Sequence, residues 1–373
     1  MLVAAILSAC LNTHGQQTAA DQTQLKLLQP ALDAIRADTI LEHIKKLASD
    51  EFEGRGPGTR GETLTVNYLV DQFKRSGVRP GNPDGTFVQK VPLIGSQTTP
   101  EIEIEAGGQT MSLKFLDEFV HDFPSLRRSA LVRNTGVVFA GYGIVAPEFG
   151  WDDYKGVDVR NKLVFVLSGE PSQPDRNDPK KSDSAFFKGD TRTYYSTREA
   201  KYDLAGKRGA AGVLVVYDPD ASKTYSLFQT FAKMEGFGLK PANINSAPLI
   251  SGLITIGAAR RLFALAGQDL DKLQTAASRP DRAFVQIKAK ADISVKSKIR
   301  TVISHNVVAR VEGSDPKLKN EYVIYSAHWD HLGKDTNLKG DQIYNGAQDN
   351  AVGTAQLLEV ARGFARLASK PKR

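Results

Sequence analysis

The chain has 373 residues, of which 41% are hydrophobic and 24% are charged, and its formal net charge is +7. A chain of this size and composition can bury a sizeable core, which excludes a disordered protein and favours two domains. The 49 basic residues are scattered, apart from a run at Arg362, Arg366, Lys370, Lys372 and Arg373, and no basic face with interleaved aromatic residues can be identified, so we expect no nucleic-acid partner.

Residues 1–10 form an apolar run that ends at Cys10, the only cysteine of the chain. The run is too short to span a bilayer but has the length of a secretory signal core. Leu7-Ser8-Ala9-Cys10 resembles a bacterial lipobox, in which the cysteine is acylated after cleavage, although the usual preceding Lys or Arg is missing. We therefore predict an exported periplasmic or cell-surface lipoprotein, lipidated at Cys10 and touching the membrane only through that lipid. A soluble secreted protein is the alternative.

Residues 11–29 are rich in Gln and Thr, and we predict that they form a flexible tether. The fold is expected to begin near Pro30 with a helix over 35–47, for which Asp38 or Thr39 would be the N-cap.

A second helix is predicted over 64–73, and Gly77 would end it. The glycine-rich stretch at 54–61 has no Gly-Lys-Ser/Thr ending and follows no strand, so it is predicted to be a turn-rich loop and not a phosphate loop.

Residues 96–296 have a β-rich pattern that predicts an inserted domain. Short β-type runs lie at 101–105, 135–140, 163–167, 212–217 and 283–287. A helix over 197–208 is expected to lead directly into the strand at 212–217. The string Gly141-Tyr142-Gly143 fits a dinucleotide fingerprint, but Pro147 follows where a helix must begin, so no dinucleotide site is expected.

From residue 297 the pattern returns to an α/β core. Strands are predicted at 306–311 and 322–327, the second apolar enough to be buried on both faces. Residues 349–367 are predicted to form an amphipathic helix. Its expected buried stripe consists of Leu357, Val360, Ala361 and Phe364. The predicted peptidase-like core thus comprises residues 30–95 and 297–373, interrupted by the insert at 96–296.

A candidate metal site lies where this last strand ends. His328 follows the strand directly, and Asp330 is available to accept the second imidazole N–H, which would orient the ring. Asp349 lies 21 residues after His328, at the predicted helix start, and a carboxylate there could bridge two metal ions. A lone His-x-Asp is commonly a surface pair and a lone Asp before a helix is commonly an N-cap. Their order on a strand end and a helix start favours a metal site.

The motifs resemble those of the zinc-dependent aminopeptidases of metallopeptidase family twenty-eight. The resemblance is carried by His328-Trp329-Asp330-His331-Leu332-Gly333, by Asn345-Gly346-Ala347-Gln348-Asp349-Asn350-Ala351-Val352-Gly353 and by Phe52-Glu53-Gly54-Arg55 with Gly58-Thr59. Residues 141–154 and 195–217 resemble the protease-associated domain that many bacterial members carry. Val352 departs from the small residue usual before the glycine. The resemblance implies a three-layer α/β zinc-aminopeptidase fold, here incomplete, with that domain inserted.

By that resemblance His328 would bind the first zinc ion, Asp349 would bridge both ions, and Asp330 would orient His328. The family's Glu-Glu pair, which includes the general base, and its later Asp and His are absent, so the chain looks like a fragment. A catalytic zinc normally takes three protein ligands plus water. The first ion would have two and the second only one, and we do not expect His331 or Glu359 to substitute. We therefore predict weak or no zinc binding and no activity from this chain alone.

The predicted activity of the complete enzyme is hydrolysis of N-terminal peptide bonds in a peptide or protein substrate. One alternative is a non-catalytic binding module with a vestigial site. Another is a related metallohydrolase, such as a carboxypeptidase or a deacylase, which can share the His-x-Asp start. Serine hydrolase chemistry is not expected, because the chain contains no Gly-x-Ser-x-Gly elbow.

Overall fold

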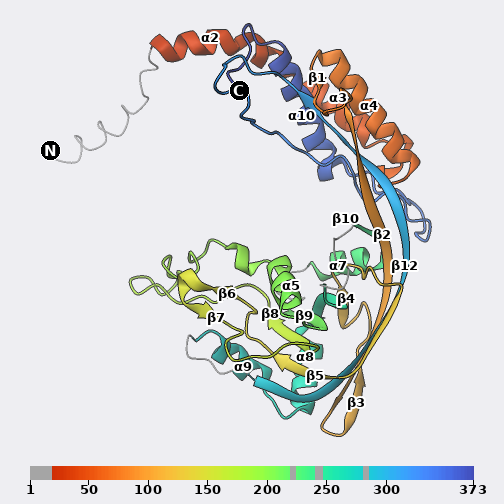
Figure 1. Cartoon of the computed structure of the whole chain (residues 1–373), viewed down its shortest axis with the longest axis vertical. Coiled ribbons are helices and arrows are strands. Elements are labelled where there is room, and N and C mark those ends of the chain that lie inside the picture. The colour runs from red at the N-terminus through yellow and green to blue at the C-terminus, as the bar shows by residue number, and fades with distance from the viewer. Residues whose placement is uncertain (1–18, 219–223, 240–246, 280–284) are drawn as a thin grey trace, which may run out of the picture. The chain divides into compact units, whose positions relative to one another are not determined.

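The computed structural model describes residues 19–218, 224–239, 247–279 and 285–373 (Figure 1). Cys10 and the predicted signal lie outside these residues, as does the start of the tether. The chain divides into two compact units. Unit 1 contains the described residues up to Pro92 together with Val302–Arg373, and unit 2 is Leu93–Thr301. The predicted insert, 96–296, therefore falls within unit 2. Among the described residues, no helix is long and apolar enough to cross a membrane.

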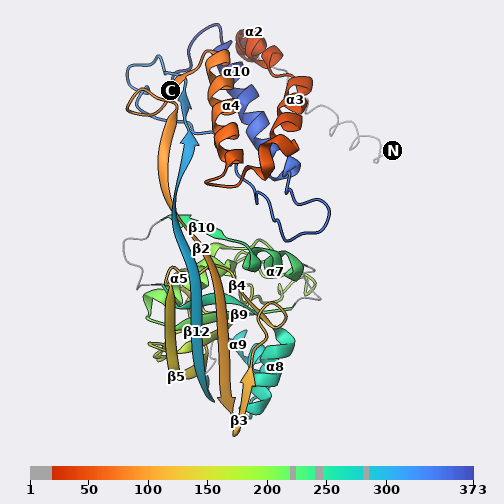
Figure 2. The same ribbon diagram turned by 90° about the vertical axis from the view of Figure 1, so that its right-hand side faces the viewer.

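Unit 1 is built mainly from helices. These are α2 (Ala19–Ala34), α3 (Ala37–Leu47), α4 (Arg60–Ser76) and α10 (Val352–Ala365), together with the short η1 (Asp50–Arg55) and η5 (Ala347–Ala351). Helix α10 contacts α2, α3 and α4, and it lies among them in Figure 2. Two short strands, β1 (Arg79–Pro80) and β13 (Ala309–Arg310), form an antiparallel pair.

The predicted helix at 64–73 is confirmed as part of α4. The Thr59 side chain caps its first turn by accepting a hydrogen bond from the Glu62 backbone N–H, and Gly77 ends it in the left-handed conformation, with φ +83°. The predicted cap of α3 was wrong. The helix begins at Ala37 with Arg36 as the N-cap, so Asp38 and Thr39 lie inside its first turn, where the Asp38 carboxylate accepts from the Arg36 guanidinium and from the Thr39 N–H.

The flexible tether predicted for residues 11–29 was wrong from residue 19 onward, because α2 begins there. Tertiary contact explains the difference, since α2 packs on α10. The two helices approach closely at Gly363, where a Cβ would lie 2.9 Å from the Ala31 carbonyl oxygen. Composition alone does not reveal such a neighbour.

The strand predicted at 322–327 is not formed. This segment has no regular secondary structure, and the side chains of Tyr322 and Ile324 are 78% and 83% exposed. A strand needs neighbours that accept and donate its ladder hydrogen bonds, and no described strand pairs with it. The strand predicted at 306–311 is divided at Val308 between the end of β12 (Val285–Val307) and β13.

The buried stripe predicted for α10 was shifted. The buried residues are Thr354, Ala355, Leu358, Glu359 and Gly363, whereas the four predicted residues are only half-buried. Helix α10 begins at Val352, three residues after Asp349, and it faces α3 on one side and α4 on the other. Its buried face therefore includes a charged residue, Glu359, that a hydrophobic pattern does not identify.

Unit 2 contains the large mixed sheet, with strand order β10-β2-β12-β5-β8-β9-β11-β4. The strands are β2 (Val88–Ala106), β4 (Phe119–His121), β5 (Ser129–Phe139), β8 (Leu163–Leu167), β9 (Gly212–Tyr217), β10 (Gly236–Leu239), β11 (Ile250–Thr255) and β12, with β3 (Gln109–Ser112) paired to β2. The four strands β5, β8, β9 and β11 are parallel neighbours. Predicted strands 163–167 and 212–217 are confirmed as β8 and β9.

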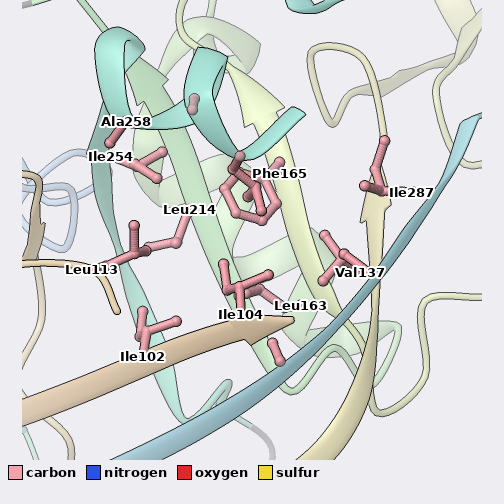
Figure 3. Close-up of a cluster of buried hydrophobic side chains, with 14 of the residues drawn as sticks. Ile102, Ile104, Leu113, Val137, Leu163, Phe165, Leu214, Ile254, Ala258 and Ile287 are labelled. Carbon is pink, nitrogen blue, oxygen red and sulfur yellow. The ribbon is translucent and has the colours of Figure 1, made fainter. Parts of the chain in front are cut away.

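Helices cover both faces of this sheet. Residues of α8 (Ile256–Leu265) and α9 (Leu270–Ala277) belong to a cluster with Leu163, Phe165 and Leu214, part of which is drawn in Figure 3. The opposite faces of β8 and β9 pack with α5 (Arg198–Lys207) and α7 (Tyr225–Lys233). Strands covered on both faces explain the continuous apolar runs. Together with the helices of unit 1, the sheet confirms the predicted α/β class.

The Gly141–Ala146 stretch forms a turn and a two-residue strand, β6 (Val145–Ala146), which pairs with β7 (Trp151–Asp152). Only the three-residue η2 (Pro147–Phe149) lies between them. The glycines are thus followed by a two-residue strand and a three-residue helix, and not by the helix that follows the glycines of a dinucleotide-binding fingerprint.

Candidate metal centre

The three predicted site residues lie together in unit 1, on loops that precede α10. The His328 Nε2 atom lies 3.3 Å from the Asp349 Oδ1 atom. On the other side of the ring, His328 Nδ1 is 3.1 Å from the Asp330 backbone carbonyl oxygen and 3.5 Å from the Asp330 Oδ1 atom. The ring is therefore oriented with Nδ1 toward Asp330 and Nε2 toward Asp349.

The spacing of His328 and Asp349 suits two ligands of one zinc ion. Zinc lies about 2.0 to 2.2 Å from nitrogen and oxygen ligands, so two donors on a tetrahedral ion are about 3.3 to 3.5 Å apart. The 3.3 Å between Nε2 and Oδ1 falls in this range. The side chains of His328 and Asp349 are 56% and 68% exposed, so an ion and a substrate can approach them from solvent.

His331 is the nearest additional donor. Its Nδ1 atom lies 3.7 Å from the Asp349 Oδ2 atom, and its side chain is only 16% exposed. Burial lowers the pKa of His331, and the positive charge of Arg55 acts in the same direction, although the Asp349 carboxylate opposes them. The imidazole is therefore neutral at pH 7, the state in which histidine binds metals.

Glu359, which was not expected to substitute as a ligand, makes its contacts away from this cluster. Its carboxylate accepts a hydrogen bond from the Arg36 backbone N–H at 3.0 Å, and it lies 3.2 Å from Arg362 and 3.7 Å from His43. The Glu359 carboxylate therefore contacts other residues of the helical core of unit 1 and not the proposed zinc ligands.

The donor set is one short of a catalytic zinc site. Within residues 19–218, 224–239, 247–279 and 285–373, no group of three or more His, Cys, Asp or Glu side chains is arranged to hold a metal ion. His328 and Asp349 fit two positions around one ion, whereas a catalytic zinc takes three protein ligands.

Short contacts hold the backbone of these loops. The Thr354 hydroxyl, in the first turn of α10, donates to the His328 carbonyl oxygen at 3.0 Å. The Trp329 indole N–H donates to the His305 carbonyl oxygen at 2.9 Å. Asp349 lies in η5 with non-helical backbone angles, and its peptide bond to Asn350 is cis.

Sequence reasoning missed the role of Arg55, although it noted the segment that contains it. The Arg55 side chain is fully buried, and its guanidinium donates to backbone carbonyl oxygens of both site loops. The only signal was an arginine inside a glycine-rich stretch, and residue type alone does not show which carbonyls it reaches.

The segment that contains these three residues matches a known protein family. Residues 306–373 match the family model for Peptidase family M28. The matched segment contains His328, Asp330 and Asp349, so it confirms the resemblance that these motifs predicted. None of the curated protein sequences compared with the chain matches it.

Similar solved structures include the aminopeptidase from Aneurinibacillus sp. strain AM-1, with 19% identity over 91% of this chain and 61% of that one, and a TM-score of 0.43. A peptidase M28 precursor from Shewanella amazonensis SB2B has 16% identity over 95% of this chain and 66% of that one, and a TM-score of 0.44. BSAP, a zinc aminopeptidase from Bacillus subtilis, has 13% identity over 89% of this chain and 58% of that one, and a TM-score of 0.34. The chain thus spans between 58% and 66% of the length of these proteins.

Proposed function

We propose that this chain is part of a zinc-dependent aminopeptidase that hydrolyses N-terminal peptide bonds of a peptide or protein substrate. The observation that carries the proposal is the 3.3 Å approach of His328 Nε2 to Asp349 Oδ1, inside the segment that matches the M28 model. An ion pair between His328 and Asp349 would have the same separation, so the proposal rests on the distance together with the family match of this segment.

In this proposal His328 and Asp349 hold zinc, and Asp330 orients the His328 ring. When bound, zinc would polarise the scissile carbonyl and lower the pKa of water. Asp349 would bridge two ions in the complete site. The described residues supply two donors for one ion, so we expect weak zinc binding and no turnover from the 373-residue chain by itself.

A zinc titration of the purified chain tests the metal site, with a fluorescent chelator as the competitor. We expect weak binding by the wild type and its loss in His328→Ala and Asp349→Ala. Asp330→Asn should weaken binding about 10- to 100-fold, as changes to groups that orient ligands do. His305→Ala is the matched control, because His305 also pairs with a carboxylate, Glu62, in the same unit. Equal affinity in all variants would contradict the proposal.

Activity is tested separately with leucine p-nitroanilide and with its N-acetylated form. We expect no EDTA-sensitive turnover of either substrate by the wild-type chain. Turnover of the free amine would contradict the expected inactivity and support aminopeptidase specificity. Turnover of only the blocked substrate would favour a different hydrolase.

A second candidate function is a non-catalytic binding module, in which unit 2, proposed to be a protease-associated domain, carries the function. The lack of a three-donor group in the described part of the chain favours this alternative. Zinc affinity that is unchanged in His328→Ala and Asp349→Ala would support it over the peptidase.

We also propose that the protein is exported and anchored by a lipid on Cys10. Metabolic labelling with a fatty-acid analogue should mark the wild type and not Cys10→Ser. Equal labelling of both would exclude this anchor.

A further inference from the structure

The Arg55 guanidinium connects three separate segments of unit 1 through backbone carbonyl oxygens. Its Nε atom donates to the Trp329 carbonyl at 2.8 Å, and Nη2 donates to the Gly346 carbonyl at 2.8 Å. Nη1 donates to the carbonyls of Asn345 at 2.7 Å and Leu47 at 2.5 Å. Trp329 lies between His328 and Asp330, and Gly346 lies three residues before Asp349. One side chain thus binds the loop of each proposed zinc ligand.

The chemistry of this contact favours arginine over lysine. A guanidinium has five N–H donors in a rigid plane, whereas an ammonium has three donors at one point. The four carbonyls come from four residues, and all of them bind the three nitrogens of one fork. The Arg55 side chain is 0% exposed, so its removal would leave buried carbonyls without partners.

The backbone around Arg55 is also shaped by the two loops. Glu53, Gly54 and Arg55 are all left-handed, with φ of 48°, 65° and 53°. This conformation costs about 1 to 2 kcal/mol for each residue other than glycine, so contacts must hold it. The Gly333 N–H donates to the Gly54 carbonyl at 3.0 Å, and the His331 N–H donates to the Arg55 carbonyl at 3.3 Å.

The backbone groups that Arg55 binds in the two loops are less exposed to solvent than the side chains of the proposed ligands. The guanidinium and the carbonyls it binds are buried or half-buried, whereas the side chains of His328 and Asp349 are mostly exposed. Exposed side chains by themselves have freedom to move apart. The two side chains pair directly, and the backbone positions of their loops limit the separations that they can take up.

We propose that Arg55 is a positioning residue that sets the spacing between His328 and Asp349 by binding the carbonyls of both loops, so that the ligands are arranged before metal binds. This inference rests on the proposed function, because it gives the spacing a role in zinc binding. The contacts themselves require no metal, so the inference can be tested without one.

The test compares hydrogen exchange of wild type, Arg55→Ala and Arg55→Lys in EDTA. Phe73→Leu is the control for a general loss of packing, because it alters the Phe73–Phe87 stack in the hydrophobic cluster that also contains Trp329, and the comparison is made at matched loss of thermal stability. We expect at least tenfold faster exchange of amides at 328–350 in both Arg55 variants and unchanged exchange at 93–301. Guanidinium ions should restore protection in Arg55→Ala, whereas ammonium ions at the same concentration should not.

Exchange at 328–350 no faster than in Phe73→Leu would overturn the inference. Rescue by ammonium would also overturn it, since charge alone would then suffice. Loss of protection throughout unit 1 in both Arg55 variants would also overturn the inference, because Arg55 would then stabilise the whole unit and not specifically the spacing between His328 and Asp349. Zinc affinity that is unchanged in His328→Ala and Asp349→Ala would count against the proposed function and would leave the exchange result unaffected.

Discussion

Gly54 lies where the backbones of two site loops come closest to η1. A Cβ at this position would lie 2.3 Å from the Gly333 carbonyl oxygen and 2.6 Å from the Tyr344 carbonyl oxygen. Both neighbours are backbone atoms, which cannot move aside as a flexible side chain can. The residue also has φ +65°, a conformation that glycine adopts at little cost.

We therefore predict that Gly54→Ala lowers the free energy of unfolding of unit 1 by about 3 kcal/mol, through strain and steric overlap together. Urea unfolding monitored by circular dichroism would measure the change. Gly77→Ala is the matched control, because Gly77 has φ +83° but nothing within 4 Å of the added Cβ. Its cost should be about 1 kcal/mol, from backbone conformation alone. Equal losses of unfolding free energy in the two variants would show that the backbone around Gly54 shifts to make room for the added Cβ.

His43 is a buried titratable residue that the proposed chemistry does not use. Its Nδ1 atom lies 2.6 Å from the Tyr68 hydroxyl oxygen, and its Nε2 atom lies 3.7 Å from Glu359. Burial lowers the pKa of His43 below 6.5, although the charges of Glu359 and Glu42 oppose the shift and that of Arg362 adds to it. The folded state therefore takes up a proton at lower pH than the unfolded state.

This shift makes the stability of unit 1 depend on pH. The stabilising contribution of neutral His43 should be complete above pH 6.5 and be lost as the pH falls from 6.5 to the folded-state pKa. We predict that the stability difference between wild type and His43→Gln narrows as the pH falls from 8 to 5. Urea unfolding of both proteins across this range measures it. A constant difference would mean that His43 does not titrate differently in the two states.

At the scale of elements, the segment 322–327 has the composition of a strand without its structure. Tyr322, Val323, Ile324 and Tyr325 are 78%, 65%, 83% and 54% exposed. Backbone groups and apolar side chains exposed together favour pairing with another chain. We therefore expect the purified chain to self-associate through this segment.

Ile324→Lys should reduce that association, because it places a charge in the middle of the segment. Since Ile324 is almost fully exposed, the free energy of unfolding should change by less than about 0.5 kcal/mol. Light scattering after size exclusion measures the mass at several concentrations. Leu239→Lys, at a residue that is 69% exposed in unit 2, is the control and should leave association unchanged. An equal effect of both substitutions would point to general solubility and not to this segment.

At the scale of the molecule, each unit has its own hydrophobic clusters. The sheet of unit 2 is packed with helices on both faces, and its two clusters include most of its central strands. The clusters of unit 1 are smaller and join α3, α4 and α10 with η1 and Trp329. Because each unit has its own hydrophobic core, we expect each unit to unfold in its own cooperative transition.

We predict two calorimetric transitions for the whole chain, with unit 1 melting at the lower temperature. Residues 93–301 expressed alone should fold and reproduce the second transition within a few degrees. Calorimetry of both proteins provides the measurement. A single transition in the whole chain, or an unfolded 93–301 fragment, would show that the units depend on each other for stability.

The sequence alone was sufficient to predict two central strands of unit 2 and the family resemblance, and it brought forward three candidate site residues that the structure places close together. Strands 163–167 and 212–217 were predicted at their observed bounds, because buried parallel strands are marked by uninterrupted apolar residues. His328, Asp330 and Asp349 could be chosen because metal-binding side chains at a characteristic spacing leave a signature in residue type. A helix stop at Gly77 is similarly local, because it depends on one residue's conformation.

Tertiary structure decided the features that depend on distant neighbours. Residues 322–327 have the pattern of a strand but lack a described partner, and residues 19–29 are helical because α2 packs on α10. The contacts of Arg55 were not predictable from sequence, since its acceptors are backbone carbonyls, which every residue has. The sequence determines which chemical groups each side chain carries. The hydrogen-bond partner of a side chain such as Arg55 depends on which backbone segments the fold brings within hydrogen-bond distance.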